Sequence, residues 1–464
     1  MNLTDTSKIA IFKSSRIVFP DAVLPAILIV LRGKIERIYR YEDEDEAHRI
    51  LKDYTAPVED FGSLVLMPGV IDSHVHVNEP GRTTWEGFET ATHAAAAGGV
   101  TTIVDMPLNS IPPTTTVENL KVKVKIATGK TSVDVGFWGG VVPGNKDDLE
   151  GLVNAGVVGF KCFMCPSGVG EFPYVHEGDI KLALGELKRL QSLLAFHAEY
   201  EKEEFSQPGD PSLYSTFLNS RPPSMEYNAI KIATSLCKSF HSRCHIVHLS
   251  ASDSLELVRE AKKNGAPLTV ETCNHYLNIV AEEIPQGATE YKCTPPIRGK
   301  SNQDKLWGAV KEGLLDMVVS DHSPCPENIK TPGNFMTAWG GIASLQFDLS
   351  LLWTGARQRN FTLMEVSRLL SANPAKVVGL DKIKGTIKEG IDADFVAWNP
   401  EDTFVVERAH IHHKNKLTPY EGKKLFGVVV ATIVRGQYVY NKGQFADKPK
   451  GKLLLRKEFL ENIE

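Results

Sequence analysis

The sequence has no hydrophobic segment long enough to cross a membrane. Its longest uninterrupted apolar run is Val23–Leu31, which contains Pro25 and is far shorter than the roughly 20 residues that a transmembrane helix needs. The first residues also lack a basic region followed by an apolar stretch, which is the pattern of a secretory signal. We therefore expect no membrane association and a cytoplasmic location.

An excess of positive charge is absent as well. Lysine and arginine total 52 against 57 acidic residues, which gives a formal net charge of −5. A chain with this balance presents no overall basic field to phosphate backbones. We therefore expect no nucleic-acid partner.

Cysteine is scarce, with 7 residues in a chain of 464. An odd number of widely spaced cysteines is unlike the disulfide framework of a small secreted domain, so we expect free thiols. Cys162 and Cys165 form a C-x-x-C pair, which also occurs in redox and zinc sites. Because no second pair stands at zinc-finger spacing, a structural or cavity-lining role is favoured.

The central part of the chain has the pattern of an α/β fold. From residue 64 onward, short runs rich in valine, isoleucine and phenylalanine alternate with longer segments of helical spacing, as in repeated βα units. Eight strands with crossover helices predict a closed (β/α)8 TIM-like barrel, whose chemistry lies at the carboxyl ends of the strands. The predicted strands are Leu64–Val77, Thr101–Met106, Val133–Val142, Val157–Met164, Leu193–Glu199, Cys244–Ser250, Leu268–Cys273 and Met317–His322.

Both ends of the chain read as strands broken by turns, over residues 9–39 and again over 385–442. Neither flank is long enough to close a good core alone. We therefore expect the two flanks to pair into one small β-sandwich. The predicted division is 1–62 for its N-terminal part, 63–382 for the barrel, and 383–464 for its C-terminal part and tail.

The sharpest motif is His74-Val75-His76, at the end of the first predicted strand. Because side chains alternate along a strand, the two histidines point the same way and can hold one cation through their ring nitrogens. Two histidines at this spacing also occur in ordinary cores and on surfaces. The motif therefore needs support from the rest of the chain.

That support comes from other strand ends, where a barrel keeps its catalytic groups. His197 ends the fifth predicted strand, and Asp321 lies at the end of the eighth. His245 and His248 lie in the sixth, three residues apart, so a regular strand directs only one of them toward the same point. Several imidazoles and a carboxylate from different strand ends predict a metal site.

Lys161 lies at the end of the fourth predicted strand and faces the same cavity. Burial and nearby cations disfavour an ammonium group there and favour the neutral amine, which can add carbon dioxide. The resulting carbamate would offer one oxygen to each of two metal ions. A lysine paired with an acid or reaching solvent is the alternative, and the spacing does not decide between them.

These motifs resemble the cyclic amidohydrolases of the amidohydrolase superfamily, which include dihydroorotases, dihydropyrimidinases, hydantoinases and allantoinases. The resemblance covers essentially the whole chain. It implies two zinc ions, carbon dioxide or bicarbonate to modify the lysine, and a homotetramer. It also selects His248 over His245. The implied metal ligands are His74, His76, Lys161 as N6-carboxylysine, His197, His248 and Asp321.

Within the family, the chain is most similar to the allantoinases. Dihydroorotases carry an arginine two positions after the second histidine, where it pairs with the substrate carboxylate, whereas this chain has Asn78. The tyrosine that follows the lysine strand in dihydropyrimidinases is also missing. Thr294 stands where hydantoinases have a serine before Pro-Pro. The similar segments are His76–Phe88, Met106–Asn109, Lys161–Phe163, Lys292–Arg298 and Ala338–Ile342.

The resemblance implies hydrolysis of the hydantoin-ring amide of (S)-allantoin to allantoate, a step of purine catabolism. A hydroxide bridging the two zinc ions is the implied nucleophile. Asp321 is the implied general base, which then returns the proton to the leaving nitrogen. The expected substrate contacts are Asn78, Asn109, Ser167, Thr294 and Gly340.

Two alternatives stay open at this point. A dihydropyrimidinase or hydantoinase acting on another cyclic diamide would share all six metal residues. A catalytically silent relative would keep the fold as a scaffold for assembly, although the complete ligand set argues against it.

Overall fold

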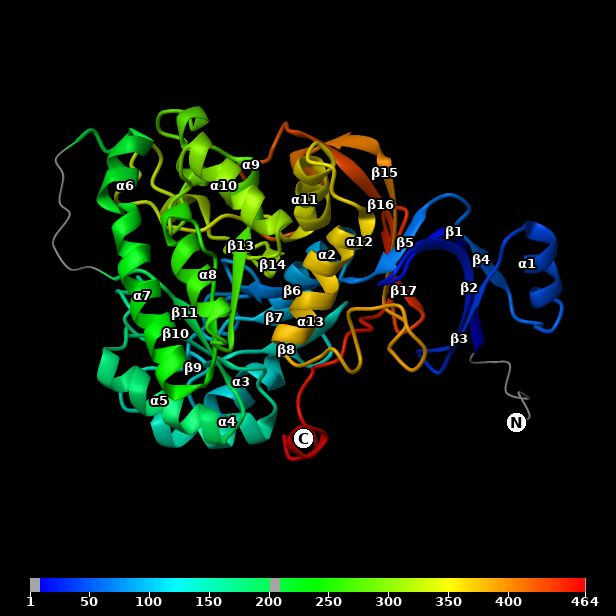
Figure 1. Ribbon diagram of the computed structural model, residues 1–464, viewed down its shortest axis with the longest axis horizontal. Coiled ribbons are helices and arrows are strands. Elements are labelled where there is room, and N and C mark those ends of the chain that lie inside the picture. Colours follow the sequence, from blue (N-terminus) through cyan, green and yellow to red (C-terminus); the bar gives the residue numbers. More distant parts are fainter. Residues whose placement is uncertain (1–8, 201–208, 464) are drawn as a thin grey trace.

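The structure is a computed structural model that describes residues 9–200 and 209–463. It has two parts, a barrel surrounded by helices and a mixed β-sheet on one side of it (Figure 1). The first strands of the chain and the last strands lie together in that mixed sheet.

Parallel strands form the barrel. One sheet has the order β6-β7-β8 and a second has the order β14-β13-β12-β11-β10-β9. A parallel bridge between Val75 and His322 joins the two ends. The (β/α)8 expectation is therefore confirmed. The strands are β6 (Val70–Val75), β7 (Val100–Asp105), β8 (Asp134–Phe137), β9 (Gly139–Gly140), β10 (Phe160–Phe163), β11 (Leu193–His197), β12 (Arg243–Ile246), β13 (Leu268–Cys273) and β14 (Met317–Val319).

The first predicted barrel strand is in fact two strands. β5 (Val65–Pro68) belongs to the mixed sheet, and β6 begins the barrel. Gly69 stands between them, where a Cβ would collide with the side chain of Thr101. The expectation of one strand over residues 64–77 was wrong because an apolar run does not reveal which sheet it joins.

The third predicted strand is also interrupted. β8 pairs with β7, and β9 pairs with β10, so the break falls at Trp138. The buried indole Nε1 of Trp138 donates to the carbonyl oxygen of Ser73 at 2.8 Å, across the barrel interior. The third predicted strand thus divides at Trp138, whose backbone N–H still donates to the carbonyl oxygen of Asp105 at 3.0 Å.

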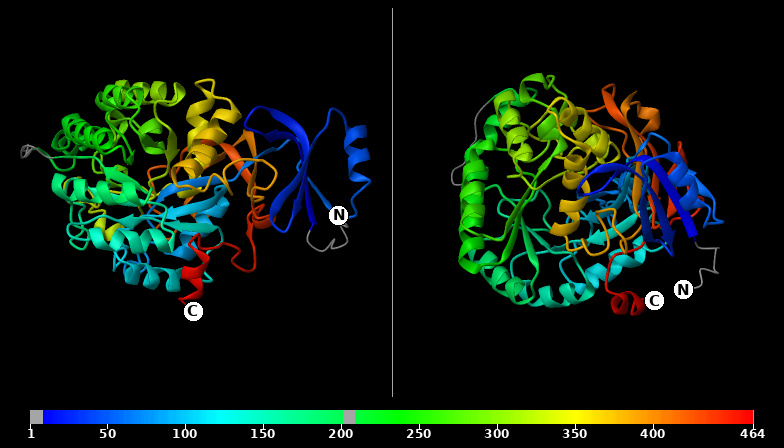
Figure 2. Two further views of the ribbon diagram at one scale, coloured as in Figure 1. Left: turned by 60° about the horizontal axis from the view of Figure 1, so that its bottom comes forward. Right: turned by 45° about the vertical axis from the view of Figure 1, so that its right-hand side comes forward.

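Helices cover the outside of the barrel, as the right-hand view of Figure 2 shows. In α5, residues Ile180, Ala183, Leu184 and Leu187 are buried, which is the stripe of a helix packed on a sheet. No helix in the described ranges is both long and apolar enough to cross a membrane. The α-helices are α1 (Glu44–Leu51), α2 (Phe88–Ala97), α3 (Val117–Ala127), α4 (Leu149–Ala155), α5 (Glu177–Arg189), α6 (Tyr214–Ser220), α7 (Pro223–Phe240), α8 (Leu255–Lys263), α9 (Asn274–Asn278), α10 (Lys300–Lys311), α11 (Asp348–Arg357), α12 (Leu363–Ser367), α13 (Asn373–Val377) and α14 (Lys457–Glu461).

The mixed sheet joins the two ends of the chain in the order β18-β17-β16-β15-β5-β1-β2-β3, with β4 beside β1. Phe12 and Leu28 from one end share a buried core with Phe395 and Ile433 from the other. The sandwich built from both flanks is thus confirmed, whereas the division after residues 62 and 382 stays a prediction. The strands are β1 (Ile9–Val18), β2 (Val23–Leu31), β3 (Lys34–Arg40), β4 (Val58–Asp60), β5, β15 (Phe395–Val405), β16 (Lys424–Val434), β17 (Gln437–Asn441) and β18 (Gln444–Phe445).

All seven cysteines lie within the described ranges, and no disulfide joins any two of them. Each is buried. This agrees with the reduced thiols expected from the sequence.

Candidate metal centre

Four of the predicted ligands meet at the carboxyl end of the barrel. His74 is in β6, His76 follows that strand, and Asp321 lies two residues after β14. The Nε2 atoms of His74 and His76 lie 3.1 Å and 3.5 Å from Oδ1 of Asp321. The Nζ atom of Lys161, in β10, lies 3.0 Å from the same His74 nitrogen. Their donor atoms therefore converge on one small region.

The other two predicted ligands lie beside this group. His197 is the last residue of β11, and His248 follows β12. Their ring centres are 4.6 Å apart, and the ring of His248 is 5.3 Å from that of His74. Both are buried. The structure thus brings all six predicted ligand positions together.

His245 and His248 both face the interior, which strand alternation alone did not predict. β12 ends at Ile246, and His248 has a left-handed backbone with φ of 39°. The strand geometry that would separate the two side chains has ended before His248 is reached. His245 Nε2 instead lies 2.9 Å from Oε2 of Glu271.

Two buried glutamates stand behind the histidines. Oε1 of Glu271 lies 2.5 Å from Nδ1 of His74, and Oε2 of Glu199 lies 2.6 Å from Nε2 of His197. An ionised carboxylate can only accept, so these ring nitrogens carry the hydrogens. The opposite nitrogens, Nε2 of His74 and Nδ1 of His197, keep their lone pairs for a cation.

The sequence reasoning did not select either glutamate. A usable signal was present for Glu271, which is a buried charge inside the otherwise uncharged strand β13. Such a residue needs a partner in a barrel interior. For Glu199, two residues after His197, the sequence offers no comparable signal.

Burial controls the protonation of the imidazoles. It lowers the pKa of each of the four predicted histidine ligands, and the charge of Lys161 lowers the pKa of His74 further. The neutral imidazole is the form that binds metals. The four histidines are therefore prepared to act as ligands near neutral pH.

The other two groups are shifted in directions that also suit a metal centre. Burial lowers the pKa of Lys161 to about 8, which increases the fraction of free amine. Burial alone would raise the pKa of Asp321, but the hydrogen bond to His76 and the charge of Lys161 outweigh it and lower the pKa. Asp321 is therefore an ionised carboxylate at neutral pH.

This donor set fits divalent metal ions. Donor atoms of His74, His76 and Asp321 lie within 4.8 Å of one another and are buried. Buried nitrogen and carboxylate donors of this kind suit zinc and similar ions. The expectation of a metal-binding site is thus supported by the chemistry of the residues.

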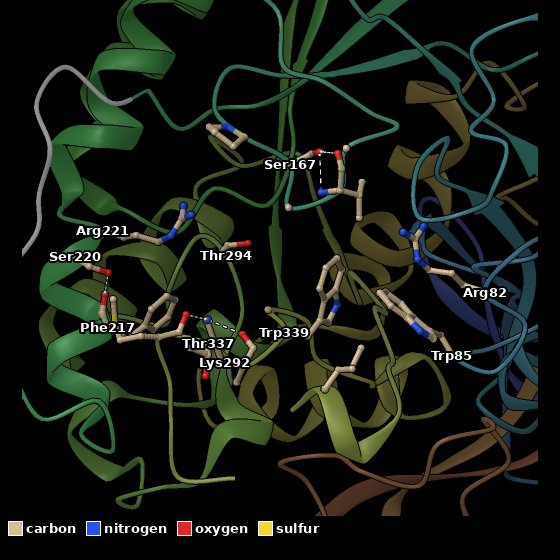
Figure 3. A pocket seen from close by; sticks show the side chains of 18 residues that line it. Arg82, Trp85, Ser167, Phe217, Ser220, Arg221, Lys292, Thr294, Thr337 and Trp339 are labelled. Atoms are coloured by element: carbon tan, nitrogen blue, oxygen red, sulfur yellow. Dashed lines mark hydrogen bonds between the residues drawn. The ribbon is translucent and has the colours of Figure 1, made fainter. Parts of the chain in front are cut away.

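Two connected cavities lead to the centre. The inner cavity has a volume of about 50 Å³ and is lined by predicted ligands, including Lys161 and Asp321. The outer cavity has a volume of about 880 Å³. In Figure 3, Trp85 and Trp339 lie on one side of it and Arg221 and Lys292 on the other. The residues that line both cavities are Ser167, Thr294, Trp339 and Gly340.

Four of the five predicted substrate contacts line the inner cavity, and Asn78 does not. The buried Asn78 side chain donates through Nδ2 to the carbonyl oxygen of Pro324 at 3.3 Å. This hydrogen bond ties Asn78 to the segment after Asp321, and its direct contact with substrate stays a prediction. The four that line the cavity are Asn109, Ser167, Thr294 and Gly340.

The backbone is strained around the centre. Asn78, Asn109, His248 and Asp321 all have positive φ, between 39° and 68°. Side chains other than glycine adopt this region at a cost, and such residues cluster at functional sites. At Asn109 the result is a side chain whose Nδ2 lies 3.3 Å from Nδ1 of His76.

Two further histidines are buried nearby. His322 accepts the backbone N–H of Ser344 on Nδ1 at 3.2 Å, and its Nε2 lies 3.3 Å from Glu86, so it has a structural role. His275 has no hydrogen-bond partner on either ring nitrogen among the described residues. Burial lowers the pKa of His275 to about 4, so it is neutral.

Known proteins share both the sequence and the fold. The allantoinase of Streptomyces avermitilis is 48% identical over 448 residues, which covers 96% of this chain and 98% of that protein. The allantoinase of Saccharomyces cerevisiae is 46% identical, covering 92% and 93%. The structure of L-hydantoinase (dihydropyrimidinase) from Arthrobacter aurescens matches with a TM-score of 0.89 and 30% identity, covering 97% of this chain and all of that one.

The family profile described as "Amidohydrolase family" matches residues 65–439, which spans the barrel and much of the mixed sheet. The resemblance expected from the strand-end motifs is thus confirmed. The complete donor set at the barrel mouth agrees with it. The chain belongs to the amidohydrolase family.

Proposed function

We propose that the chain is an allantoinase, which hydrolyses the hydantoin-ring amide of (S)-allantoin to allantoate. The observation that carries the reaction class is the convergence of the six predicted ligands: five of them line one inner cavity, and His74 contacts Asp321 and Lys161 beside it. The similarity to allantoinases over nearly the whole chain supports the substrate.

We propose that two divalent metal ions, both zinc, bind to two groups of these ligands. His74, His76 and Asp321 would hold one ion, and His197 and His248 the other, with a carboxylated Lys161 between them. Bound divalent ions would supply Lewis acidity and lower the pKa of water to about 7. The lowered pKa of Lys161 supports its carboxylation by carbon dioxide.

Asp321 is the proposed general base and acid. Its carboxylate is ionised and lies at the inner cavity. Oδ1 or Oδ2 can therefore accept a proton from the water that attacks the ring amide. The same carboxyl group can then return the proton to the leaving ring nitrogen. This accounts for both proton movements with one residue.

The inner cavity also favours an uncharged ring. Asn109, Ser167 and Thr294 offer amide and hydroxyl groups there, which match the donors and acceptors of a cyclic diamide. Among its described lining residues, Lys161 is the only lysine or arginine side chain. A substrate carboxylate, as in dihydroorotate, would therefore lack the arginine partner that dihydroorotases provide.

The decisive experiment compares ring substrates. Protein reconstituted with zinc and bicarbonate is assayed with allantoin, dihydroorotate, dihydrouracil and hydantoin. Preferential opening of allantoin is the expected result, with activity that falls when bicarbonate is withheld. Faster turnover of dihydrouracil or hydantoin would assign a hydantoinase-type specificity, and no turnover of any ring would favour a silent scaffold.

The last two parts of the proposal concern location and assembly. We propose a cytoplasmic homotetramer. A relative from Aquarana catesbeiana, 50% identical over 391 residues, is described as a mitochondrial allantoinase. Fractionation of cells will test the location, and light scattering of the purified protein will test the tetramer.

A further inference from the structure

The ring of His197 is clamped from two sides. Its face stacks on Phe163, with ring centres 4.4 Å apart and an angle of 13° between the planes. Its Nε2 edge lies 2.6 Å from Oε2 of Glu199, whose side chain is completely buried. The ring therefore has little freedom to rotate or to change tautomer.

Arg221 holds the same glutamate. Nη1 of Arg221 lies 2.7 Å from Oε2 of Glu199, the oxygen that also contacts His197. Arg221 lies between α6 and α7, and its side chain is 23% exposed because it lines the outer cavity (Figure 3). One guanidinium thus connects the substrate entrance to the back of a predicted metal ligand.

A second arginine–carboxylate pair continues this connection. Nη2 of Arg298 lies 2.7 Å from Oε2 of Glu226, and Nη1 of Arg298 donates to the carbonyl oxygen of Arg221 at 3.2 Å. Oε1 of Glu226 accepts the backbone N–H groups of Ser250 and Ala251 at 2.9 Å and 3.0 Å. These two residues follow His248 in the chain.

We propose that Glu199 and Arg221 are positioning residues for the second metal ion. Glu199 holds the proton on Nε2 of His197, so that Nδ1 presents its lone pair to the ion. Arg221 holds the Glu199 carboxylate in place through its hydrogen bond to Oε2. The Arg298–Glu226 pair holds the segment after His248, because Glu226 accepts the backbone N–H groups of Ser250 and Ala251. This inference rests on the metal centre of the proposed function.

The physical reason is that a neutral imidazole has two tautomers, and only one of them leaves Nδ1 bare. A carboxylate at the far nitrogen selects that tautomer and makes the ligand more basic. Loss of such an outer partner typically weakens metal binding by about 10- to 100-fold. The effect falls on the ion that His197 binds, and not equally on both.

The test uses Glu199→Leu and Glu199→Gln in the full-length protein. Each is reconstituted with Co²⁺, and the affinity for each ion is measured by competition with a chelator, together with the visible absorption spectrum. We expect Glu199→Leu to lower the affinity for one of the two Co²⁺ ions by about 10- to 100-fold and to change the visible absorption spectrum. Glu199→Gln should recover most of this loss, because its amide oxygen can still accept from Nε2.

Glu312→Leu serves as the matched control, since Glu312 forms an exposed ion pair with Arg259 at 2.7 Å away from the centre. It should bind both ions like the wild type. Should Glu199→Leu fail to fold, Arg221→Met and Arg221→Lys replace it. Weaker binding of one ion in Arg221→Met, with recovery in Arg221→Lys, would support the proposal.

Three results would overturn the proposal, and they are distinguishable from failure of the allantoinase assignment. Unchanged affinities and spectrum in Glu199→Leu would refute the positioning role alone, as would an equal loss of both ions. A wild-type protein that binds no metal ion would refute both this role and the proposed centre. Turnover of allantoin does not enter any of these measurements.

Discussion

At the scale of single residues, the centre depends on what burial does to each group. The imidazoles are neutral because burial lowers their pKa values, and carboxylates behind two of them fix which nitrogen carries the hydrogen. Asp321 is the only acidic residue among the described residues that line the inner cavity. We therefore propose that this one carboxylate carries the proton transfers of the reaction.

Replacing Asp321 with asparagine should reduce turnover of allantoin by at least about 100-fold, because an amide cannot take up the proton. Metal content should fall much less, since the other ligands are unchanged. Steady-state kinetics and elemental analysis measure the two effects. Asp316→Asn is the control. Asp316 stands just before the first residue of β14, at the end of the strand away from Asp321, and it pairs with Lys262. Near-normal turnover in Asp321→Asn would refute its role.

At the scale of elements, one loop forms much of the entrance. The segment 326–341 carries Trp339 and Gly340, which line both cavities. Nζ of Lys292 donates to the carbonyl oxygen of Ala338 at 2.6 Å, and Nζ of Lys330 donates to that of Gly341 at 2.6 Å. Two lysine side chains thus hold the loop through its backbone carbonyls.

The pKa of Lys292 provides a pH test of this arrangement. Burial, together with the charges of Lys330 and Arg221, lowers that pKa to about 7. In the unfolded chain, a lysine has a pKa of about 10.4. Between these pH values the unfolded chain binds more protons than the native one. The free energy of unfolding of the wild type therefore rises with pH in this window through this group.

Lys292→Gln removes that dependence while keeping a hydrogen-bond donor. We compare the free energy of unfolding of the variant with that of the wild type. The difference, variant minus wild type, should be largest at pH 7 and fall toward pH 10. Urea unfolding at several pH values measures the difference. A difference that stays constant over this range would show that Lys292 does not titrate as described.

At the scale of the whole molecule, a buried ionic cluster fastens the mixed sheet to the barrel. Nζ of Lys384 lies 2.8 Å from Asp134, in β8, and 2.5 Å from Asp394, just before β15. Arg435, after β16, also contacts Asp134. The C-terminal part of the mixed sheet is therefore held to the barrel by charges that are largely removed from water.

Lys384→Met should lower the free energy of unfolding by about 3–5 kcal/mol, because it leaves buried carboxylates without their shared cation. Lys34→Met is the comparison. Lys34 pairs with Asp392 at 3.0 Å, but its side chain is half exposed, so its loss should cost no more than about 1 kcal/mol. Chemical denaturation of both variants measures the two free energies of unfolding. Equally small decreases in the two variants would contradict a central role for Lys384.

Much of the fold could be predicted from linear order. The barrel strands and their helices follow from the alternation of short apolar runs with helical spacing, which local preference and burial impose together. The division of residues 64–77 between two sheets could not be predicted, because β5 and β6 follow each other closely and both consist entirely of buried residues. Only their partners in space distinguish them.

The candidate site divides in the same way. The histidines, the lysine and the aspartate could be selected because a barrel places strand ends at one mouth, whatever its loops do. Arg221 could not, since its role arises from a contact with Glu199, which lies 22 residues away in the chain. The same holds for the hydrogen bond of Asn78 to Pro324, which lies 246 residues away in the chain. Periodicity along a chain determines elements and their order, whereas distances between side chains on different elements exist only after packing is complete.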